Sequence, residues 1–182
     1  IATLDLYSGG RFVLGVGAGW SPEESAAMGA NFGRRWAQTR EAVAVMKTLW
    51  TQEEPEFHGE FYDFPPVRFF PKPAQTPHPP VLLGGRSKYL FERIASWADG
   101  WIPIGIAPDD LRAGRAEIAR LCESKGRDPD TVHVTVYGLS ADSEAIDAFK
   151  AAGADRATIG VNPSSDADPY RRLEEAARAA GL

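Results

Sequence analysis

The chain has 182 residues, of which 43% are hydrophobic and 25% are charged, a composition typical of a globular protein that excludes a largely disordered chain. A net charge of -5 with scattered lysine and arginine residues argues against a basic face for nucleic acid. The single cysteine, Cys122, excludes an intramolecular disulfide framework and indicates a reducing, cytoplasmic setting, and no apolar stretch approaches the ~20 residues that span a bilayer.

The first ten residues, IATLDLYSGG, predict the last turn of a helix over Ala2–Leu6 that stops at Gly9 and Gly10. A chain that opens inside a helix, on Ile1 rather than methionine, indicates a fragment of a longer protein. The next segment, RFVLGVG at 11–17, is a short apolar run without alternation, which is typical of a parallel strand buried on both faces.

Two helices are expected after this strand. The first begins cleanly, because Ser21 is a suitable N-cap, Pro22 suits the first helical position, and Glu24 completes a capping box. The second, over about Arg34–Trp50, carries apolar residues at helical spacing. The segment 55–80 that follows is rich in proline and aromatic residues, and FHGEFYDF within it predicts an irregular hairpin that leaves the main fold.

Regular alternation resumes after residue 80. The segments PVLLGG, GWIPIG, TVHVTVYGL and RATIGV are expected strands, each followed by an expected helix. With the first strand this makes five, which favours a single α/β domain over 1–182 with a parallel sheet and right-handed crossovers. A doubly wound open sheet and part of a closed barrel both remain possible on this pattern, since five strands are too few for an eight-stranded barrel.

The glycines of GVGAGW, at 15–20, are not a dinucleotide fingerprint. Gly15, Gly17 and Gly19 are spaced by two residues, whereas the fingerprint needs its third glycine three residues after the second. They are either a simple strand-to-helix turn or a strand end kept free of side chains so that a flat ring can lie against the backbone.

The stretch GGRSK, at 84–88, is a stronger signal. It follows an apolar strand directly and opens an expected helix, for which Ser87 is a candidate N-cap. Arg86 and Lys88 add positive charge, so the stretch is either a phosphate loop or a glycine turn with solvated cations. Ligands of parallel sheets bind beyond the carboxyl ends of the strands, which favours the phosphate loop.

Other kinds of site find little support. His58, His78 and His133 share no metal-ligand spacing with one another or with Cys122, so we expect no metal centre, and we expect His58 and His78 in exposed loops. The chain carries no nucleophile elbow of the type G-x-S-x-G.

Four segments together, ATLDLYSGGRFVLGVGAGW, FHGEFYDF, PKPAQTPHPPVLLGG and ADGW, resemble the luciferase-like monooxygenase superfamily, and most of all its deazaflavin-dependent branch, whose cofactor is coenzyme F420. The resemblance runs from Ala2 to about Pro108, in order and spacing. Members of that family are (β/α)8 TIM barrels. The resemblance therefore implies a partial barrel, approximately strands four to eight, with the proline-rich hairpin at 55–80 as an insertion.

The resemblance also implies where a cofactor would lie. The expected cofactor-binding residues are Gly15, Gly17, Gly19 and Trp20 at the ring, Gly84, Gly85, Arg86 and Ser87 at the phosphate, and Ile104 and Gly105 as the rest of the phosphate wall. Trp20 stands where some deazaflavin-dependent sugar-phosphate dehydrogenases carry an acidic glutamate, which argues against a sugar-phosphate substrate. The family's catalytic histidine and non-proline cis peptide belong to the first three strands, so no catalytic residue is identified here.

The implied function is that of a flavin- or deazaflavin-dependent oxidoreductase or monooxygenase, with FMN or coenzyme F420 as cofactor and a small-molecule substrate. The alternatives are a non-catalytic flavin-binding or interaction module derived from this fold and a phosphosugar-binding barrel. A barrel that lacks three strands exposes sheet edges and an apolar interior, contributed by Phe12, Leu14, Leu82, Ile102 and Ile159 among others. We therefore expect a homo-oligomer or part of a longer chain.

Overall fold

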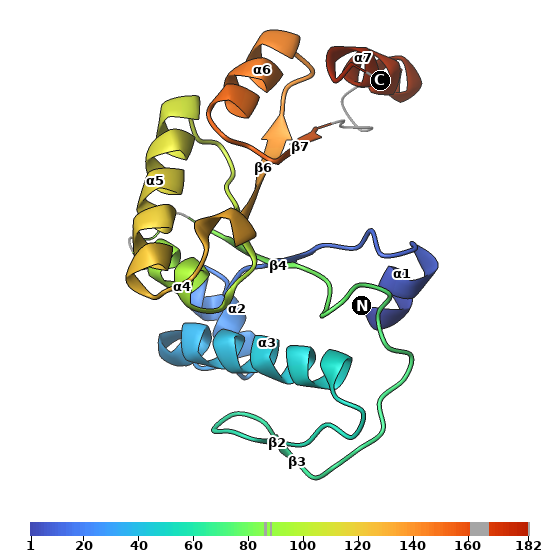
Figure 1. Cartoon of the computed structure of the whole chain (residues 1–182), viewed down its shortest axis with the longest axis vertical. Helices are drawn as coiled ribbons and strands as arrows, with labels where there is room; N and C mark the ends of the chain where they lie inside the picture. Colours follow the sequence, from blue (N-terminus) through green and yellow to red (C-terminus); the bar gives the residue numbers. More distant parts are fainter. Residues whose placement is uncertain (86, 88, 161–167, 182) are drawn as a thin grey trace. The chain divides into compact units, whose positions relative to one another are not determined.

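The computed structural model describes residues 1–85, 87, 89–160 and 168–181 (Figure 1). The chain divides into two compact units, Ile1–Val81 and Leu82–Leu182, and each is described by itself. Among the described residues, no helix has the length and hydropathy needed to cross a membrane.

The first unit opens as the sequence predicts. Helix α1 (Ala2–Tyr7) is followed by a glycine pair, and strand β1 (Leu14–Val16) follows. The amide of Gly10 donates to the carbonyl of Asp5 at 2.9 Å, which satisfies a carbonyl at the end of the helix. The strand is shorter than the apolar run that predicted it.

A buried carboxylate ties α1 to distant parts of this unit. The Asp5 side chain is fully buried, and its Oδ1 accepts from the Phe12 amide at 3.3 Å and from Gln75 Nε2 at 2.6 Å. Its Oδ2 accepts from the Gln75 amide at 2.9 Å. Burial by itself would raise the pKa of Asp5, but the hydrogen bonds from Gln75 and Phe12 outweigh it and lower that pKa.

Helix α2 (Pro22–Ala27) begins as expected, because Ser21 Oγ accepts from the Glu24 amide at 3.1 Å and Pro22 occupies the first helical position. The Ser21 hydroxyl in turn donates to Glu23 Oε2 at 2.9 Å. A short 3-10 helix, η1 (Phe32–Arg34), then leads into the long helix α3 (Arg35–Thr51). The expected helix over about 34–50 is confirmed with nearly the same bounds.

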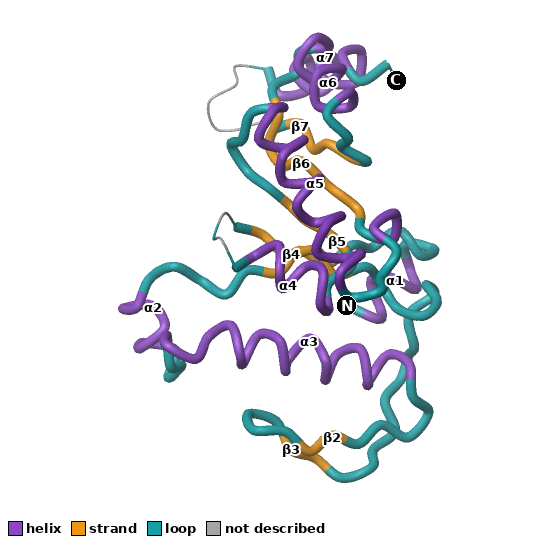
Figure 2. The backbone as a smooth tube through the Cα atoms, turned by 60° about the vertical axis from the view of Figure 1, so that its left-hand side comes forward, coloured by secondary structure: helices purple, strands orange, loops and turns teal. Residues whose placement is uncertain are grey.

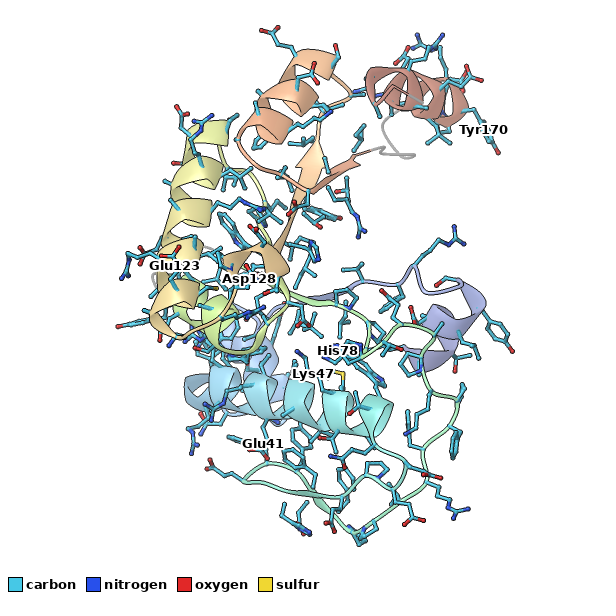
Figure 3. All side chains as sticks on the ribbon, viewed as in Figure 1. Glu41, Lys47, His78, Glu123, Asp128 and Tyr170 are labelled. Atoms are coloured by element: carbon cyan, nitrogen blue, oxygen red, sulfur yellow. The ribbon has the colours of Figure 1, made fainter. Side chains whose placement is uncertain are left out.

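Two short strands lie within the proline-rich segment. Strand β2 (Phe57–His58) pairs antiparallel with β3 (Asp63–Phe64), and Figure 2 shows this pair running alongside α3. Glu41 of α3 points toward it (Figure 3), and Glu41 Oε1 accepts from the amides of Phe61 and Tyr62 at 2.7 and 2.9 Å. One carboxylate oxygen therefore holds the loop between β2 and β3 against the helix.

The histidines of this unit differ from one another. His58 is exposed, as expected, but it lies in β2, where its Nδ1 is 2.6 Å from Asp63 Oδ1. The expectation of an exposed loop is wrong for His78, which is half-buried with its ring centroid 6.2 Å from that of Trp50. The imidazole of His78 packs near the indole ring of Trp50, and this contact shields part of it from solvent.

The second unit alternates strands with helices. All five strands predicted from the sequence are present, β1 in the first unit and four more here. Its elements are β4 (Val81–Gly84), whose first residue belongs to the first unit, α4 (Leu90–Trp97), β5 (Gly100–Ile102), α5 (Pro108–Ser124), the 3-10 helix η2 (Pro129–Thr131), β6 (His133–Leu139), α6 (Ser143–Ala151), β7 (Arg156–Ile159) and α7 (Pro169–Ala179). The strand order is β1-β4-β5-β6-β7, and the pairs β4–β5, β5–β6 and β6–β7 are parallel.

Helices cover one face of the second unit's sheet. Leu83, Trp101 and Val134 are partners in register on β4, β5 and β6, so their side chains share a face, and all three are buried. Trp101 meets Phe91 of α4 edge to face at 5.0 Å. Helix α5 contacts both α4 and α6, so these three helices form one continuous layer (Figures 1 and 2).

The opposite face carries exposed apolar side chains. Ile104 and Tyr137 form an isolated parallel bridge, and they are 56% and 52% exposed. Of the apolar residues expected to line an open barrel interior, Leu82 is buried, whereas Ile102 and Ile159 of this unit are half-buried. Burial thus falls from the middle of the sheet toward its carboxyl end.

Candidate functional site

The glycine stretch of the first unit is an open strand end. Gly17 and Gly19 have no heavy atom within 4 Å of the place where a side chain would begin, and both residues are exposed. Gly15 lies within β1 and is also exposed. Trp20, which follows them, has 83% of its surface exposed. The strand end therefore presents bare backbone beside an accessible indole, a combination that suits contact with a flat ring.

The second group of predicted residues lies at the carboxyl end of β4. Gly84 closes the strand, and Gly85 has φ +129° in a left-handed region that favours glycine. A side chain at Gly85 would find its nearest neighbour, Leu90 Cδ2, at 3.9 Å, so the space beside this backbone is open. Its carbonyl accepts a long hydrogen bond of 3.5 Å from Trp101 Nε1, which links the loop to the helix-covered face of the sheet.

Ser87 is not the N-cap of the next helix, contrary to the sequence-based expectation. Helix α4 begins at Leu90, its N-cap residue is Tyr89, and the Leu90 amide donates to the backbone carbonyl of Ser87 at 2.9 Å. The Ser87 side chain is thereby left exposed in the loop, where Arg93 Nη1 lies 3.5 Å from its Oγ. Arg86 and Lys88, the predicted cations of this loop, lie outside the described residues.

Sequence reasoning missed Arg93, which brings a positive charge beside the exposed hydroxyl of Ser87. The available signal was spacing, since Arg93 lies on the first turn of α4 just beyond the glycine loop. It also missed Tyr137, whose bridge to Ile104 brings it to the same edge. The alternation of His133, Thr135 and Tyr137 along β6 could have placed Tyr137 opposite the helix-covered valines.

The predicted phosphate wall lies at the same edge of the sheet as the glycine loop. Gly84 is the register partner of Ile102, and the chain reaches Ile104 and Gly105 within three residues of that partner. Gly105 has φ +57° and is exposed. The parallel register of β4 and β5 thus brings Gly84, Gly85, Ile104 and Gly105 to one carboxyl edge, with open backbone in both loops.

Within the described part of the chain, no group of three or more histidine, cysteine or acidic side chains is arranged to hold a metal ion. His133 is exposed at the start of β6 and lies apart in sequence from both glycine groups. The features that could hold a ligand are therefore backbone amides, hydroxyls and guanidinium groups, which are suited to anions and to planar rings.

Comparison with known proteins agrees with this architecture. The model of the luciferase-like monooxygenase family matches residues 1–181. An uncharacterised protein of Mycobacterium tuberculosis is 48% identical over 103 residues, which are 56% of this chain and 36% of the relative. An FMNH2-dependent dimethylsulfone monooxygenase of Pseudomonas putida is 30% identical over 147 residues, which are 79% of this chain and 40% of the relative. The chain thus spans less than half the length of these curated relatives.

Two solved structures share the fold. An F420-dependent secondary alcohol dehydrogenase in complex with an F420–acetone adduct superposes with a TM-score of 0.71 at 19% identity, over 87% of this chain and 66% of that one. The monooxygenase RslO1 from Streptomyces bottropensis superposes with a TM-score of 0.63 at 22% identity, over 99% of this chain and 54% of that one. Because the family model covers almost every residue, the chain belongs to the luciferase-like monooxygenase family.

Proposed function

We propose that this chain is the cofactor-binding part of a flavin- or deazaflavin-dependent oxidoreductase that acts on a small-molecule substrate. FMN or coenzyme F420 supplies hydride transfer or oxygen activation at its ring, and the protein supplies binding and orientation. One relative is an FMNH2-dependent monooxygenase and one structural neighbour is an F420-dependent dehydrogenase, so both cofactors are represented among similar proteins.

The observation that carries this proposal is the open carboxyl edge of β4 and β5. Two loops with glycines in left-handed backbone conformations, at Gly85 and Gly105, lie at adjacent strand ends, and the space beside Gly85 is clear to 3.9 Å. Such backbone lets the amides of a loop approach an anion closely, as phosphate sites require. The exposed hydroxyl of Ser87 and the guanidinium of Arg93 add donors of the right kind.

The chain's own residues would hold the cofactor in two places. Gly84, Gly85, Arg86 and Ser87 would bind the phosphate, with Ile104 and Gly105 as the wall. The bare backbone of Gly15, Gly17 and Gly19 and the indole of Trp20 would contact the ring.

The proposed architecture is a partial TIM barrel of about strands four to eight. In a barrel the helices cover only the outer face of the sheet, whereas a doubly wound sheet carries helices on both faces. In the second unit, α4, α5 and α6 form one layer, and Ile104 and Tyr137 on the other face are exposed. Both observations favour the barrel, and the segment 55–80 is then an insertion between a helix and the next strand.

The test is spectroscopic and uses the full-length protein. We expect FMN or coenzyme F420 to bind with saturable quenching of its fluorescence, and the reduced cofactor to be consumed in the presence of a substrate. Riboflavin, which lacks the phosphate, is the matched control ligand and should bind more weakly than FMN. A protein that binds a cofactor but never turns it over would instead be the non-catalytic binding module, and one that binds neither cofactor would refute the proposal.

A further inference from the structure

A pocket of about 320 Å³ lies within the first unit, along one face of α3. Gly17, which directly follows β1, and Tyr62 are among the residues that line it. The amide of Tyr62 is held by Glu41 at 2.9 Å, so the position of this wall is set by α3 itself. A volume at the lower end of the ~300–1,000 Å³ usual for ligand pockets suits a small organic molecule.

One end of the pocket is polar. Arg35, Gln38 and Thr39 line it and lie three or four residues apart on α3, so they share one helical face. Among the described residues that line the pocket, Arg35 alone carries a formal charge. An anion at this end would therefore meet no acidic side chain from the pocket wall.

The Arg35 guanidinium is oriented but not saturated. Its Nη1 donates to the carbonyl of Phe32 at 2.8 Å, and its Cζ lies 3.7 Å from the centre of the Phe32 ring. Its Nε is buried and has no hydrogen-bond partner in the described part of the chain. A guanidinium held flat by stacking matches the planar fork of a carboxylate.

The other end of the pocket is apolar. Ala42 and Met46 continue the same helical face one and two turns further along, and the buried Val43 lies beside them. The thioether of Met46 adapts to ligands of different shape. The pocket therefore has a cationic end at Arg35 and an apolar end along Ala42 and Met46.

We propose that this pocket binds a small organic carboxylate, whose carboxyl group meets Arg35 and whose short alkyl chain lies along Ala42 and Met46. Because Gly17 is also proposed to contact the cofactor ring, the carboxylate is the substrate of the oxidoreductase. This second step rests on the proposed function, whereas the binding itself does not.

The experiment measures the binding of hexanoate and of hexanol, which share a chain length but not a charge, to the cofactor-free full-length protein by calorimetry. We expect hexanoate to bind at least tenfold more tightly than hexanol, a difference of about 1.4 kcal/mol. Arg35→Met should abolish that preference and leave hexanol binding unchanged. Arg40→Met, which removes an exposed cation of the same helix that does not line the pocket, is the matched control and should behave like the wild type. Equal binding of the two ligands to the wild type, or an unchanged preference in Arg35→Met, would overturn the proposal.

Two further measurements keep the test decisive. If Arg35→Met does not fold, hexanoate but not hexanol should protect Arg35 of the wild type from phenylglyoxal modification, and absence of protection counts against the site. If FMN displaces hexanoate and riboflavin does not, the anion at Arg35 is the cofactor phosphate, and the substrate assignment is wrong. A protein that binds hexanoate through Arg35 but neither FMN nor coenzyme F420 would refute the proposed function while leaving the pocket intact.

Discussion

Replacing Asp5 by asparagine should destabilise the protein in a pH-dependent way. The carboxylate accepts three hydrogen bonds, from the Phe12 amide, the Gln75 amide and Gln75 Nε2. An asparagine side chain of the same shape has only one acceptor oxygen, so at least one part-buried N–H of Gln75 or Phe12 would face a donor. Leaving one such group without an acceptor costs ~1–3 kcal/mol, and the remaining bonds also lose the help of the charge, so we expect a loss of about 2–3 kcal/mol at pH 7.

The pH dependence follows from the direction of the pKa shift. The native pKa of Asp5 is lowered below its ordinary value of 3.8, so the folded state holds the proton less tightly than the unfolded state. The stabilisation is therefore complete well above pH 3.8 and is lost as the pH falls through the native pKa. Urea unfolding followed by tryptophan fluorescence should show the wild-type advantage over Asp5→Asn shrinking as the pH is lowered from 7 toward 3.

The control is Asp147→Asn, which changes an exposed carboxylate on α6 and should leave the free energy of unfolding within about 0.5 kcal/mol of the wild type. The reasoning would be refuted if Asp5→Asn matched this control at pH 7. It would also be refuted if the difference between Asp5→Asn and the wild type stayed constant down to pH 3, because a pH-independent loss could not come from the ionised carboxylate.

Four further outcomes are expected. Arg86→Ala should weaken the binding of FMN on the order of tenfold, since a charge-assisted hydrogen bond is worth ~1.5–3 kcal/mol, and should leave the affinity for riboflavin unchanged. Equal weakening of the binding of both ligands in a fluorescence titration would show that Arg86 does not belong to the phosphate site. Gly114→Val should lower the free energy of unfolding by ~1–3 kcal/mol, because a side chain there would begin 2.6 Å from Cζ3 of Trp101. A melting temperature no lower than that of Ala113→Val, a control at an exposed position of the same helix, would contradict this packing. Glu41→Ala should expose the loop at 59–62 to proteases, because it removes the acceptor of two backbone amides there. A cleavage pattern that matches that of a variant at an exposed glutamate would show that Glu41 does not hold the loop. The 182-residue chain alone should self-associate at low micromolar concentration through its open sheet edges, which light scattering measures. A monodisperse monomer of 19.8 kDa that also unfolds cooperatively would show that the edges are covered.

Much of the secondary structure follows from local signals. The hydroxyl of Ser21 and the fixed φ of Pro22 favour a helix start wherever they occur together, and α2 begins there. The five apolar runs predict five strands because short buried strands are recognisable by composition and by the helices between them. The glycines at strand ends likewise indicated open backbone, and Gly17, Gly19 and Gly85 are open.

Local signals fail where two local solutions compete. Ser87 is a good N-cap by composition, yet α4 begins at Leu90, and Ser87 accepts the Leu90 amide through its backbone carbonyl instead of capping the helix with its hydroxyl. The sequence around His78 predicts an exposed loop residue, whereas the ring of Trp50, 28 residues earlier, packs near it and His78 is half-buried. Whether a residue caps a helix or is exposed in a loop depends on which residues lie near it in the folded protein. The path of the whole chain determines those neighbours.

The sequence by itself determined the alternation of strands and helices, the glycine-rich strand ends and the family. Only the tertiary structure decided which distant groups meet: Asp5 with Gln75, 70 residues apart, Glu41 with the amides of Phe61 and Tyr62, and the pocket of Arg35 at the end of β1. The physical reason is that secondary structure reflects periodicity over a few residues, whereas a buried carboxylate or an unsatisfied guanidinium depends on hydrogen-bond partners that come close only when separate elements pack.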